Sequence, residues 1–328
     1  MAHDHSSAAA GHENRDDNED KHHHGHDHGH GHGHPQPSGA SGAFAIGIGL
    51  NLTFVVVEVV YGILSHSMAL VADAGHNLGD VLGLALAWGA TLLAKRSPTQ
   101  QRTYGFRGTT ILASLTNSVV LLFVTGGIAW ESVRRLFAPE HVHGTTVIVV
   151  ALVGVVINGA SAILFMSGRK GDLNIRSAFL HLAADAALAL GVAVAATVML
   201  FTGWAWIDPV VSVLLSGFIL ASTWSLLKGS LNLILAAVPE GIDAEAARRY
   251  LSELPGVVEV HDFHVWAMST TETALTAHLV MPGDQCHPAF LGEACHCLHE
   301  KFGIGHSTLQ VESPDAPHRC SQTKEGAV

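Results

Sequence analysis

Long apolar segments alternate with short polar ones over the middle of the chain, from residue 43 to residue 228. A helix that spans a membrane needs about 20 mostly apolar residues. Windows without Lys or Arg meet this requirement, and two of them are long enough to hold two spans each, divided near 65–67 and near 202–204. The pattern therefore predicts six transmembrane helices, at about 43–63, 67–93, 109–133, 146–166, 177–200 and 206–227.

Polar segments flank this apolar region on both sides. Residues 1–42 are rich in Gly, His and Asp, which predicts a disordered cytoplasmic tail, and residues 314–328 predict a second one. Residues 240–313 instead predict a helix, two strands, a helix and a last strand, at 243–254, 257–268, 272–281, 286–302 and 307–312. We therefore expect an all-α six-helix transmembrane bundle at 43–228, followed by a small C-terminal cytoplasmic α+β domain.

The composition favours a membrane protein and argues against two other classes. The chain has 328 residues, of which 48% are hydrophobic and 14% charged. Because about 25% charged residues are usual in soluble domains, a soluble cytosolic enzyme does not fit. The formal net charge of −11 argues against a nucleic-acid partner, which would require a basic surface. Histidine is unusually frequent, with 24 copies against 17 Lys and Arg together.

The distribution of basic residues predicts the orientation in the membrane, because short cytoplasmic loops are enriched in Lys and Arg. The connections after spans two, four and six hold most of the basic residues near the membrane: Lys95, Arg96, Arg102, Arg107, Arg169, Lys170, Arg176 and Lys228. The alternate connections hold only Arg134 and Arg135. Both termini are therefore expected in the cytoplasm. The polar first 42 residues do not have the pattern of a secretory signal peptide.

Two of the predicted spans contain the same motif, His-x-x-x-Asp. Span two contains His76 and Asp80, and span five contains His181 and Asp185. Ionisable residues inside a membrane are candidates for a functional site, and residues four apart lie on one helix face. Two such helices side by side would offer two nitrogens and two oxygens, the ligands that Zn²⁺ accepts in tetrahedral sites. One His–Asp pair alone is equally compatible with a structural hydrogen bond, but the duplication favours a metal site.

Small residues beside the first motif, Gly75, Gly79 and Gly83, allow a neighbouring helix to approach closely. Such packing would bring the ligands together, although small residues are also ordinary at membrane helix interfaces. Three further acidic residues in or near the spans are expected either to support the fold, for example by capping a helix, or to line a pathway: Glu58, Glu131 and Asp208.

Three segments, in this order, resemble the cation diffusion facilitator family: residues 67–80 (SMALVADAGHNLGD), 103–107 (TYGFR) and 260–266 (VHDFHVW). The paired His-x-x-x-Asp motifs resemble its zinc-transporting branch. The likeness extends over residues 43–313. It implies a ferredoxin-like cytoplasmic domain for regulation and dimerisation, a homodimer in the lipid bilayer, and export of Zn²⁺, or of a similar ion such as Cd²⁺ or Co²⁺, against protons. Together with the absent signal pattern, it favours the bacterial inner membrane.

The resemblance also implies a metal site in the C-terminal domain, with His261, His278, His306 and Glu312 as candidate ligands. His306 and Glu312 are separated by an even number of residues on one predicted strand, so both can point to the same face. A regulatory ion bound there would bridge two protomers. The alternative is a solvated polar face of the sheet.

The N-terminal tail holds a run of histidines interleaved with Gly and Asp. Clustered imidazoles bind Zn²⁺ loosely, and we expect this of His22, His23, His24, His26, His28, His30, His32 and His34. The alternatives are an unselected low-complexity tail or an expression tag, although the interleaved Asp and Gly do not resemble a tag. We expect the tail to be dispensable for transport.

The sequence therefore predicts a divalent-cation efflux transporter, a Zn²⁺/H⁺ antiporter that contributes to zinc homeostasis and resistance. Zn²⁺ is then a substrate, no catalytic cofactor is needed, and the protein is not an enzyme. The alternative is a membrane-anchored metal sensor or scaffold without transport, which would not require ligands inside the membrane. An intramembrane zinc hydrolase would require a catalytic Glu beside the ligands, as in H-E-x-x-H, and the sequence lacks this motif.

Overall fold

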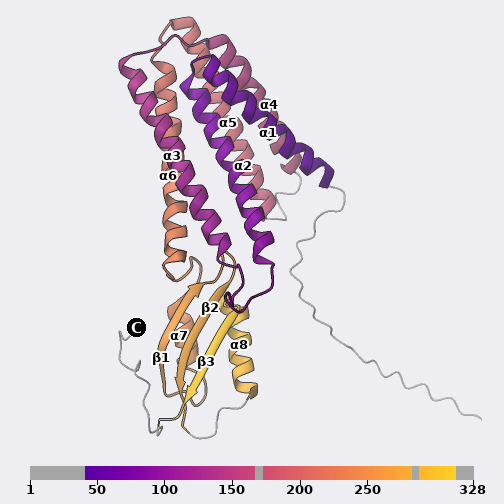
Figure 1. Cartoon of the computed structure of the whole chain (residues 1–328), viewed down its shortest axis with the longest axis vertical. Coiled ribbons are helices and arrows are strands. Elements are labelled where there is room, and N and C mark those ends of the chain that lie inside the picture. The colour runs from indigo at the N-terminus through magenta and orange to yellow at the C-terminus, as the bar shows by residue number, and fades with distance from the viewer. Residues whose placement is uncertain (1–40, 167–172, 283–287, 315–328) are drawn as a thin grey trace, which may run out of the picture. The chain divides into compact units, whose positions relative to one another are not determined.

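The computed structural model describes residues 41–166, 173–282 and 288–314. Its larger part is a bundle of six helices that run side by side (Figure 1). They are α1 (Ser41–Leu64), α2 (Met68–Ala94), α3 (Thr109–Phe137), α4 (Gly144–Met166), α5 (Leu173–Thr202) and α6 (Ile207–Ile234).

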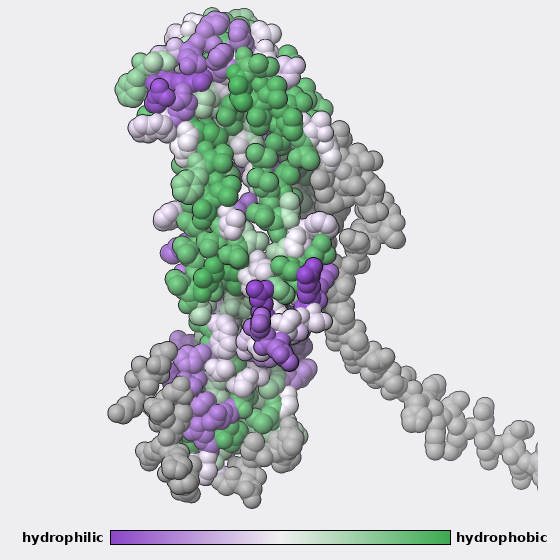
Figure 2. All heavy atoms as spheres, in the orientation of Figure 1, coloured by the Kyte–Doolittle hydropathy of each residue, from purple (hydrophilic) through white to green (hydrophobic). Residues whose placement is uncertain are grey.

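The outside of this bundle is apolar. Helices α2 to α6 are long and apolar enough to cross a membrane, and α1 contributes a shorter apolar stretch, Leu52–Leu64, among the described residues. Large side chains such as Phe123, Leu164 and Phe201 are exposed, and Figure 2 shows an apolar surface over the helices. A surface of this kind is suited to lipid rather than to water. The predicted six-helix membrane bundle is confirmed, and the chain is an integral multi-pass membrane protein.

Several helices extend beyond the spans predicted from hydropathy. α3 continues through Arg134 and Arg135, and α6 continues past Lys228. An apolar window ends at the first charge, whereas a helix can continue while its charged side chains reach polar surroundings. At the end of α3, Glu131 forms ion pairs with Arg134 (2.8 Å) and Arg135 (3.3 Å). Glu131 thus has a structural role at this helix end.

The start of α2 is fixed by two polar side chains. Ser67 precedes the helix, and its Oγ accepts a hydrogen bond from the backbone N–H of Leu70, as is usual for an N-cap residue. The buried carboxylate of Asp208, in the first turn of α6, accepts hydrogen bonds from Ser67 Oγ and from the backbone N–H of Met68 (2.7 Å). Asp208 therefore joins the beginnings of α2 and α6, which is a helix-capping role.

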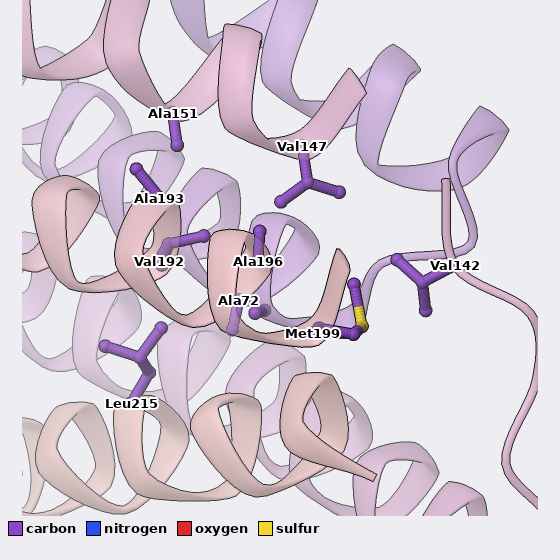
Figure 3. Close-up of a cluster of buried hydrophobic side chains, with 10 residues drawn as sticks. Ala72, Val142, Val147, Ala151, Val192, Ala193, Ala196, Met199 and Leu215 are labelled. Carbon is purple, nitrogen blue, oxygen red and sulfur yellow. The ribbon is translucent and has the colours of Figure 1, made fainter. Parts of the chain in front are cut away.

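Small apolar residues fill the interior of the bundle. α4 packs along α5, and Figure 3 shows Val147 and Ala151 of α4 facing Ala193 and Ala196 of α5. Leu215 of α6 belongs to the same buried cluster. Side chains this small allow the helix backbones to approach closely, which favours association within a lipid environment.

The glycines of α2 pack against α3. A Cβ atom at Gly79 would lie 2.6 Å from Leu121 Cδ1, and one at Gly83 would lie 2.9 Å from Asn117 Nδ2. Both neighbours belong to α3. The interpretation that these glycines bring the metal ligands together therefore needs correction, because they hold α2 against α3, while the second His-x-x-x-Asp motif lies on α5.

The smaller part is the α+β domain expected from the sequence. It contains α7 (Ala244–Ser252), β1 (Glu259–Ala267), β2 (Thr273–Val280), α8 (Pro288–Phe302) and β3 (His306–Glu312). The strand order in the sheet is β1-β2-β3, with β1 antiparallel and β3 parallel to β2. Fully buried Leu251 of α7, Leu275 and Leu279 of β2 and Leu298 of α8 belong to its hydrophobic core. The fold class predicted from the sequence is confirmed.

Candidate metal centre

Helices α2 and α5 each present one His and one Asp on a single face. His76 and Asp80 are one helical turn apart on α2, and His181 and Asp185 are one turn apart on α5. Both motifs lie within helical stretches, so their spacing is set by the backbone of the helix and not by a loop. The i and i+4 positions place each imidazole above its own carboxylate.

The two motifs converge where α2 meets α5. His76 Nε2 lies 3.5 Å from Asp185 Oδ1 and 3.8 Å from Asp80 Oδ2. His181 Nε2 lies 3.3 Å from Asp80 Oδ2 and 3.6 Å from Asp185 Oδ2. Each imidazole is therefore closer to the carboxylate of the other helix than to that of its own. We refer to His76, Asp80, His181 and Asp185 as the intramembrane cluster.

The cluster is buried on one side and accessible on the other. The exposed fraction of the side chain is 7% for Asp185 and 15% for His76, but 50% for His181. One ligand atom from each of Asp80, His181 and Asp185 lies within 4.8 Å of the others. His76 Nδ1 is buried and has no hydrogen-bond partner among the described residues. The cluster is therefore most deeply buried at Asp185 and least buried at His181.

Two loaded states satisfy the charges of this cluster. A divalent cation can bind the two imidazole nitrogens and the two carboxylate oxygens, a donor set suited to Zn²⁺. Alternatively, each imidazole can take up a proton and donate it in a hydrogen bond to a carboxylate. Because metal binding requires neutral imidazole and ionised carboxylate, the two states exclude each other. The arrangement is therefore suited to exchange a metal ion for protons.

A second group of ligand atoms lies on the sheet of the C-terminal domain. His261 of β1 is paired with His278 of β2, and Glu312 of β3 lies opposite Val280 of β2. His278 Nδ1 is 2.8 Å from Glu312 Oε1, and His261 Nε2 is 3.6 Å from Glu312 Oε2. Neither ring nitrogen of the buried His261 has a hydrogen-bond partner among the described residues. We refer to His261, His278 and Glu312 as the cytoplasmic cluster, after the location expected from the sequence, and these donors fit a metal ion.

His306, the fourth ligand predicted for this domain, does not join the cluster. It is exposed at the first position of β3, opposite Ala274, whereas Glu312 is the last residue of the strand. Six residues of extended chain separate their Cα atoms by about 20 Å. A shared strand face means that His306 and Glu312 can point in the same direction, but it does not bring the two side chains close together.

Sequence reasoning missed Asp262 as a neighbour of the cytoplasmic cluster. Its Oδ2 lies 3.4 Å from His278 Nε2, and its Oδ1 lies 2.9 Å from His264 Nε2. Strict alternation along a strand would place Asp262 on the face opposite to His261. The register shifts between His261 and His264, and Asp262 has a positive φ of 48°. Such a bulge turns a side chain to the other face, and nothing in the residue pattern predicts it.

The histidine run of the N-terminal tail, residues 22–34, lies outside the described residues. Its loose metal binding therefore stays a prediction.

Two family models match the chain, one after the other. The cation efflux transmembrane domain matches residues 44–235, and the cytoplasmic domain of cation efflux proteins matches residues 239–314. The solved structure of the metal-bound C-terminal domain of the CzcD transporter from Cuprividus metallidurans is 33% identical and covers 22% of this chain and 99% of that chain, with a TM-score of 0.20.

Three bacterial relatives match most of the chain. The metal cation efflux system protein CzcD of Cupriavidus metallidurans is 37% identical over 79% of this chain and 83% of its own length. The zinc transporter ZitB of Escherichia coli is 38% identical over 79% and 83% of the two chains. The cadmium, cobalt and zinc/H(+)-K(+) antiporter of Bacillus subtilis is 32% identical over 81% and 86%.

Proposed function

The chain belongs to the cation diffusion facilitator family, and from this membership we propose that it exports Zn²⁺ from the cytoplasm in exchange for protons. The convergence of two imidazoles and two carboxylates from α2 and α5 is the observation that supports this most strongly. Transport moves the ion without covalent chemistry on it, so the protein acts as a carrier and not as an enzyme.

The donor set and the names of the relatives both support a transition-metal substrate. Imidazole nitrogen favours Zn²⁺ and its neighbours over Mg²⁺, which prefers six oxygens. One relative is named for zinc, and another for cadmium, cobalt and zinc together. We propose Zn²⁺ as the main substrate of this chain, with Cd²⁺ and Co²⁺ as further substrates of the same site.

Competition between protons and Zn²⁺ for the same ligands drives export in the proposed cycle. An inward-facing intramembrane cluster with neutral imidazoles takes Zn²⁺ from the cytoplasm. Rearrangement of the helices then opens the cluster to the opposite side, where protonation of His76 and His181 releases the ion. The protonated cluster returns inward, and loss of its protons completes the cycle, an instance of alternating access around a fixed site.

The cytoplasmic cluster has a different role in this proposal. Zn²⁺ bound to His261, His278 and Glu312 would act as a regulatory ion that favours the transport-ready form of a homodimer. The match of residues 239–314 to a cytoplasmic domain family named for dimers supports the dimer. Weak metal binding by the N-terminal tail would raise the local supply of Zn²⁺.

The basic residues also support a location and an orientation. Because most Lys and Arg lie after α2, α4 and α6, we propose that both termini are cytoplasmic. We place the protein in the bacterial inner membrane, because the relatives that match most of the chain are bacterial transport proteins.

Reconstituted vesicles test the proposal and distinguish it from a sensor or scaffold. Proteoliposomes of the full chain, loaded with a zinc indicator, should take up Zn²⁺ faster when the lumen is acidic than when the two sides have equal pH. Asp80→Ala and Asp185→Ala should remove this flux, and His66→Ala, which changes a loop histidine outside the cluster, should leave it intact. Absence of any zinc flux would favour the sensor, and flux indifferent to the pH gradient would refute proton coupling.

A further inference from the structure

A pair of buried carboxyl groups lies beside the intramembrane cluster and is not used by the proposed metal site. Glu58 of α1 is 0% exposed and Asp73 of α2 is 3% exposed. The side chains of Glu58 and Asp73 interact with each other within the bundle. We refer to these two residues as the carboxyl pair. They come from different helices, so the contact is tertiary and not a consequence of local spacing.

The hydrogen bonds of Glu58 are incomplete unless the pair holds a proton. Glu58 Oε2 accepts a hydrogen bond of 2.9 Å from Asn77 Nδ2. Glu58 Oε1 is buried and has no donor among the described residues, because its neighbour Asp73 is itself a carboxyl group. A buried acceptor without a donor is strongly unfavourable. One proton between the two carboxyl groups supplies the missing donor and removes one of two adjacent negative charges.

In the part of the chain that the structure describes, no positively charged side chain acts on Glu58. α4 packs against α1 through Phe54 and Val150 and contains no ionisable residue. From α2, Asp73 and the neutral Asn77 face Glu58, and from α5 the carboxylate of Asp185 acts on it. His76 acts on Asp73 but is itself paired with Asp185. Among the described residues, the groups that act on Glu58 are therefore neutral or negative, so the two adjacent carboxyl groups have no positive partner there other than a proton.

We propose that Glu58 and Asp73 form a proton-binding site, separate from the four metal ligands, whose proton leaves when a divalent cation enters the intramembrane cluster. Asn77 connects the two sites, because it follows His76 directly and donates to Glu58. A bound cation places two positive charges near the carboxyl pair and favours its ionised form. By linkage, a proton on the pair weakens binding of the cation to the same degree. The inference rests on the proposed location of the metal site.

Counting protons released on metal binding tests this inference. Zn²⁺ is titrated into the detergent-solubilised full chain at pH 7, and calorimetry in buffers of different ionisation enthalpy gives the protons released per ion. Glu58→Gln keeps the shape and an acceptor for Asn77 but cannot exchange a proton. It should bind as many zinc ions as the wild type while releasing about one proton fewer per chain. The tail and the cytoplasmic cluster are identical in both proteins, so their contributions cancel.

The control and a second variant separate the outcomes. Glu131→Gln neutralises a carboxylate paired with arginines at the end of α3 and should release the wild-type number of protons. Asp73→Asn should reproduce the deficit of Glu58→Gln, and the double variant should not enlarge it, because one proton is shared. If neither single variant lowers the count, the inference is wrong. Loss of a bound zinc ion in Glu58→Gln would identify a metal ligand and would equally overturn the proton site.

Failure of the proposed antiport and failure of this inference remain distinguishable. The vesicle experiment measures coupled flux, whereas the titration measures equilibrium release of protons without transport. A Glu58-dependent release in a protein whose flux ignores the pH gradient would support the carboxyl pair and contradict the antiport. Coupled flux together with an unchanged proton count in both single variants would support the antiport and contradict the carboxyl pair.

Discussion

The intramembrane cluster and the cytoplasmic cluster use the same kinds of side chain but assemble them differently. Within the membrane, two helices each supply a complete His–Asp unit, and only the contact between α2 and α5 is needed to form the centre. In the C-terminal domain, three strands each supply one side chain, and the register of the sheet decides which residues meet. The first arrangement depends on one interface, and the second on two strand pairings.

The two clusters also differ in what surrounds them. His181 is 50% exposed and Asp80 is 31% exposed, so the intramembrane cluster is only partly enclosed by the protein. The side chains of His261, His278 and Glu312 are 7%, 14% and 17% exposed, and they form part of a sheet whose other face covers a hydrophobic core. An accessible, duplicated ligand pair suits an ion in transit, whereas a buried trio fixed by a sheet suits an ion that stays. The predictions that follow test this contrast.

The largest effect is expected from removal of the central carboxylate. Asp185 contacts both imidazoles and is the least exposed member of its cluster. Loss of a group that merely orients a metal ligand commonly weakens metal binding by about 10–100-fold, and Asp185 is itself a proposed ligand, so Asp185→Ala should reduce zinc flux by on the order of 100-fold or more. Uptake of Zn²⁺ into proteoliposomes measures this, with His66→Ala as the control. Zinc flux of Asp185→Ala within twofold of the wild type would show that Asp185 is not needed for transport.

Acidification should weaken the intramembrane cluster next. Zinc requires neutral imidazole, so protons compete with the ion and its affinity falls as the pH is lowered. With two histidines in competition, lowering the pH from 7 to 5.5 should weaken binding by on the order of tens-fold. Zinc is titrated at each pH into a variant that lacks residues 2–34 and carries His278→Ala. This variant is used because the tail and the cytoplasmic cluster then contribute no zinc binding of their own. Affinity independent of pH would contradict imidazole ligation.

Substitution of one imidazole by a carboxylate should change selectivity more than rate. His76→Asp replaces a nitrogen ligand by an oxygen ligand and makes the donor set harder. We expect transport of Mn²⁺ or Fe²⁺ relative to Zn²⁺ to rise by about tenfold. Parallel uptake measurements with each metal give this ratio. An unchanged ratio would show that His76 does not discriminate among metals.

A smaller effect is expected from the cytoplasmic cluster, where the chain supplies a matched pair of histidines. His278 contacts Glu312, whereas His306 lies at the far end of β3. His278→Ala should raise the zinc concentration for half-maximal flux by about two- to fivefold while maximal flux stays unchanged, because a regulatory ion changes populations and not the transport site. His306→Ala should change neither. Equal effects of the two variants would argue against a cluster defined by register.

The smallest effect is expected from the N-terminal tail. Deletion of residues 2–34 removes the histidine run but no member of either cluster. We expect maximal flux to be retained and the zinc dependence to shift by about twofold or less, because loose binding by the tail only changes the local supply of ions. A dose–response series of vesicle uptake measures the shift. Complete loss of flux would give the tail an essential role.

The intramembrane cluster could be predicted from the sequence because its geometry is mostly local. A spacing of four residues fixes His76 over Asp80 and His181 over Asp185 wherever the chain is helical. The charges also stand out against apolar spans, since such residues are rare within a membrane. The glycines of α2 were less informative, because small residues show that some helix approaches closely but not which one. Leu121 and Asn117 identify that helix as α3.

The cytoplasmic cluster could be predicted only in part, because strand partners are set by tertiary structure. The order of helices and strands and the alternation of faces were readable, and His261, His278 and Glu312 do lie together. The position of His306 along β3 and the bulge that turns Asp262 were not readable, since both depend on register. The partnership of Glu58 with Asp73 likewise depends on how α1 packs against α2.

Location of zinc by anomalous X-ray diffraction at its absorption edge tests the central claim most directly. In crystals of the full chain soaked with Zn²⁺, a peak should lie between α2 and α5, roughly 2.0–2.2 Å from one atom each of His76, Asp80, His181 and Asp185. The same crystals of Asp185→Ala should lose that peak and keep the one at the cytoplasmic cluster. A zinc ion elsewhere in the membrane bundle, with these four side chains directed apart, would contradict the account.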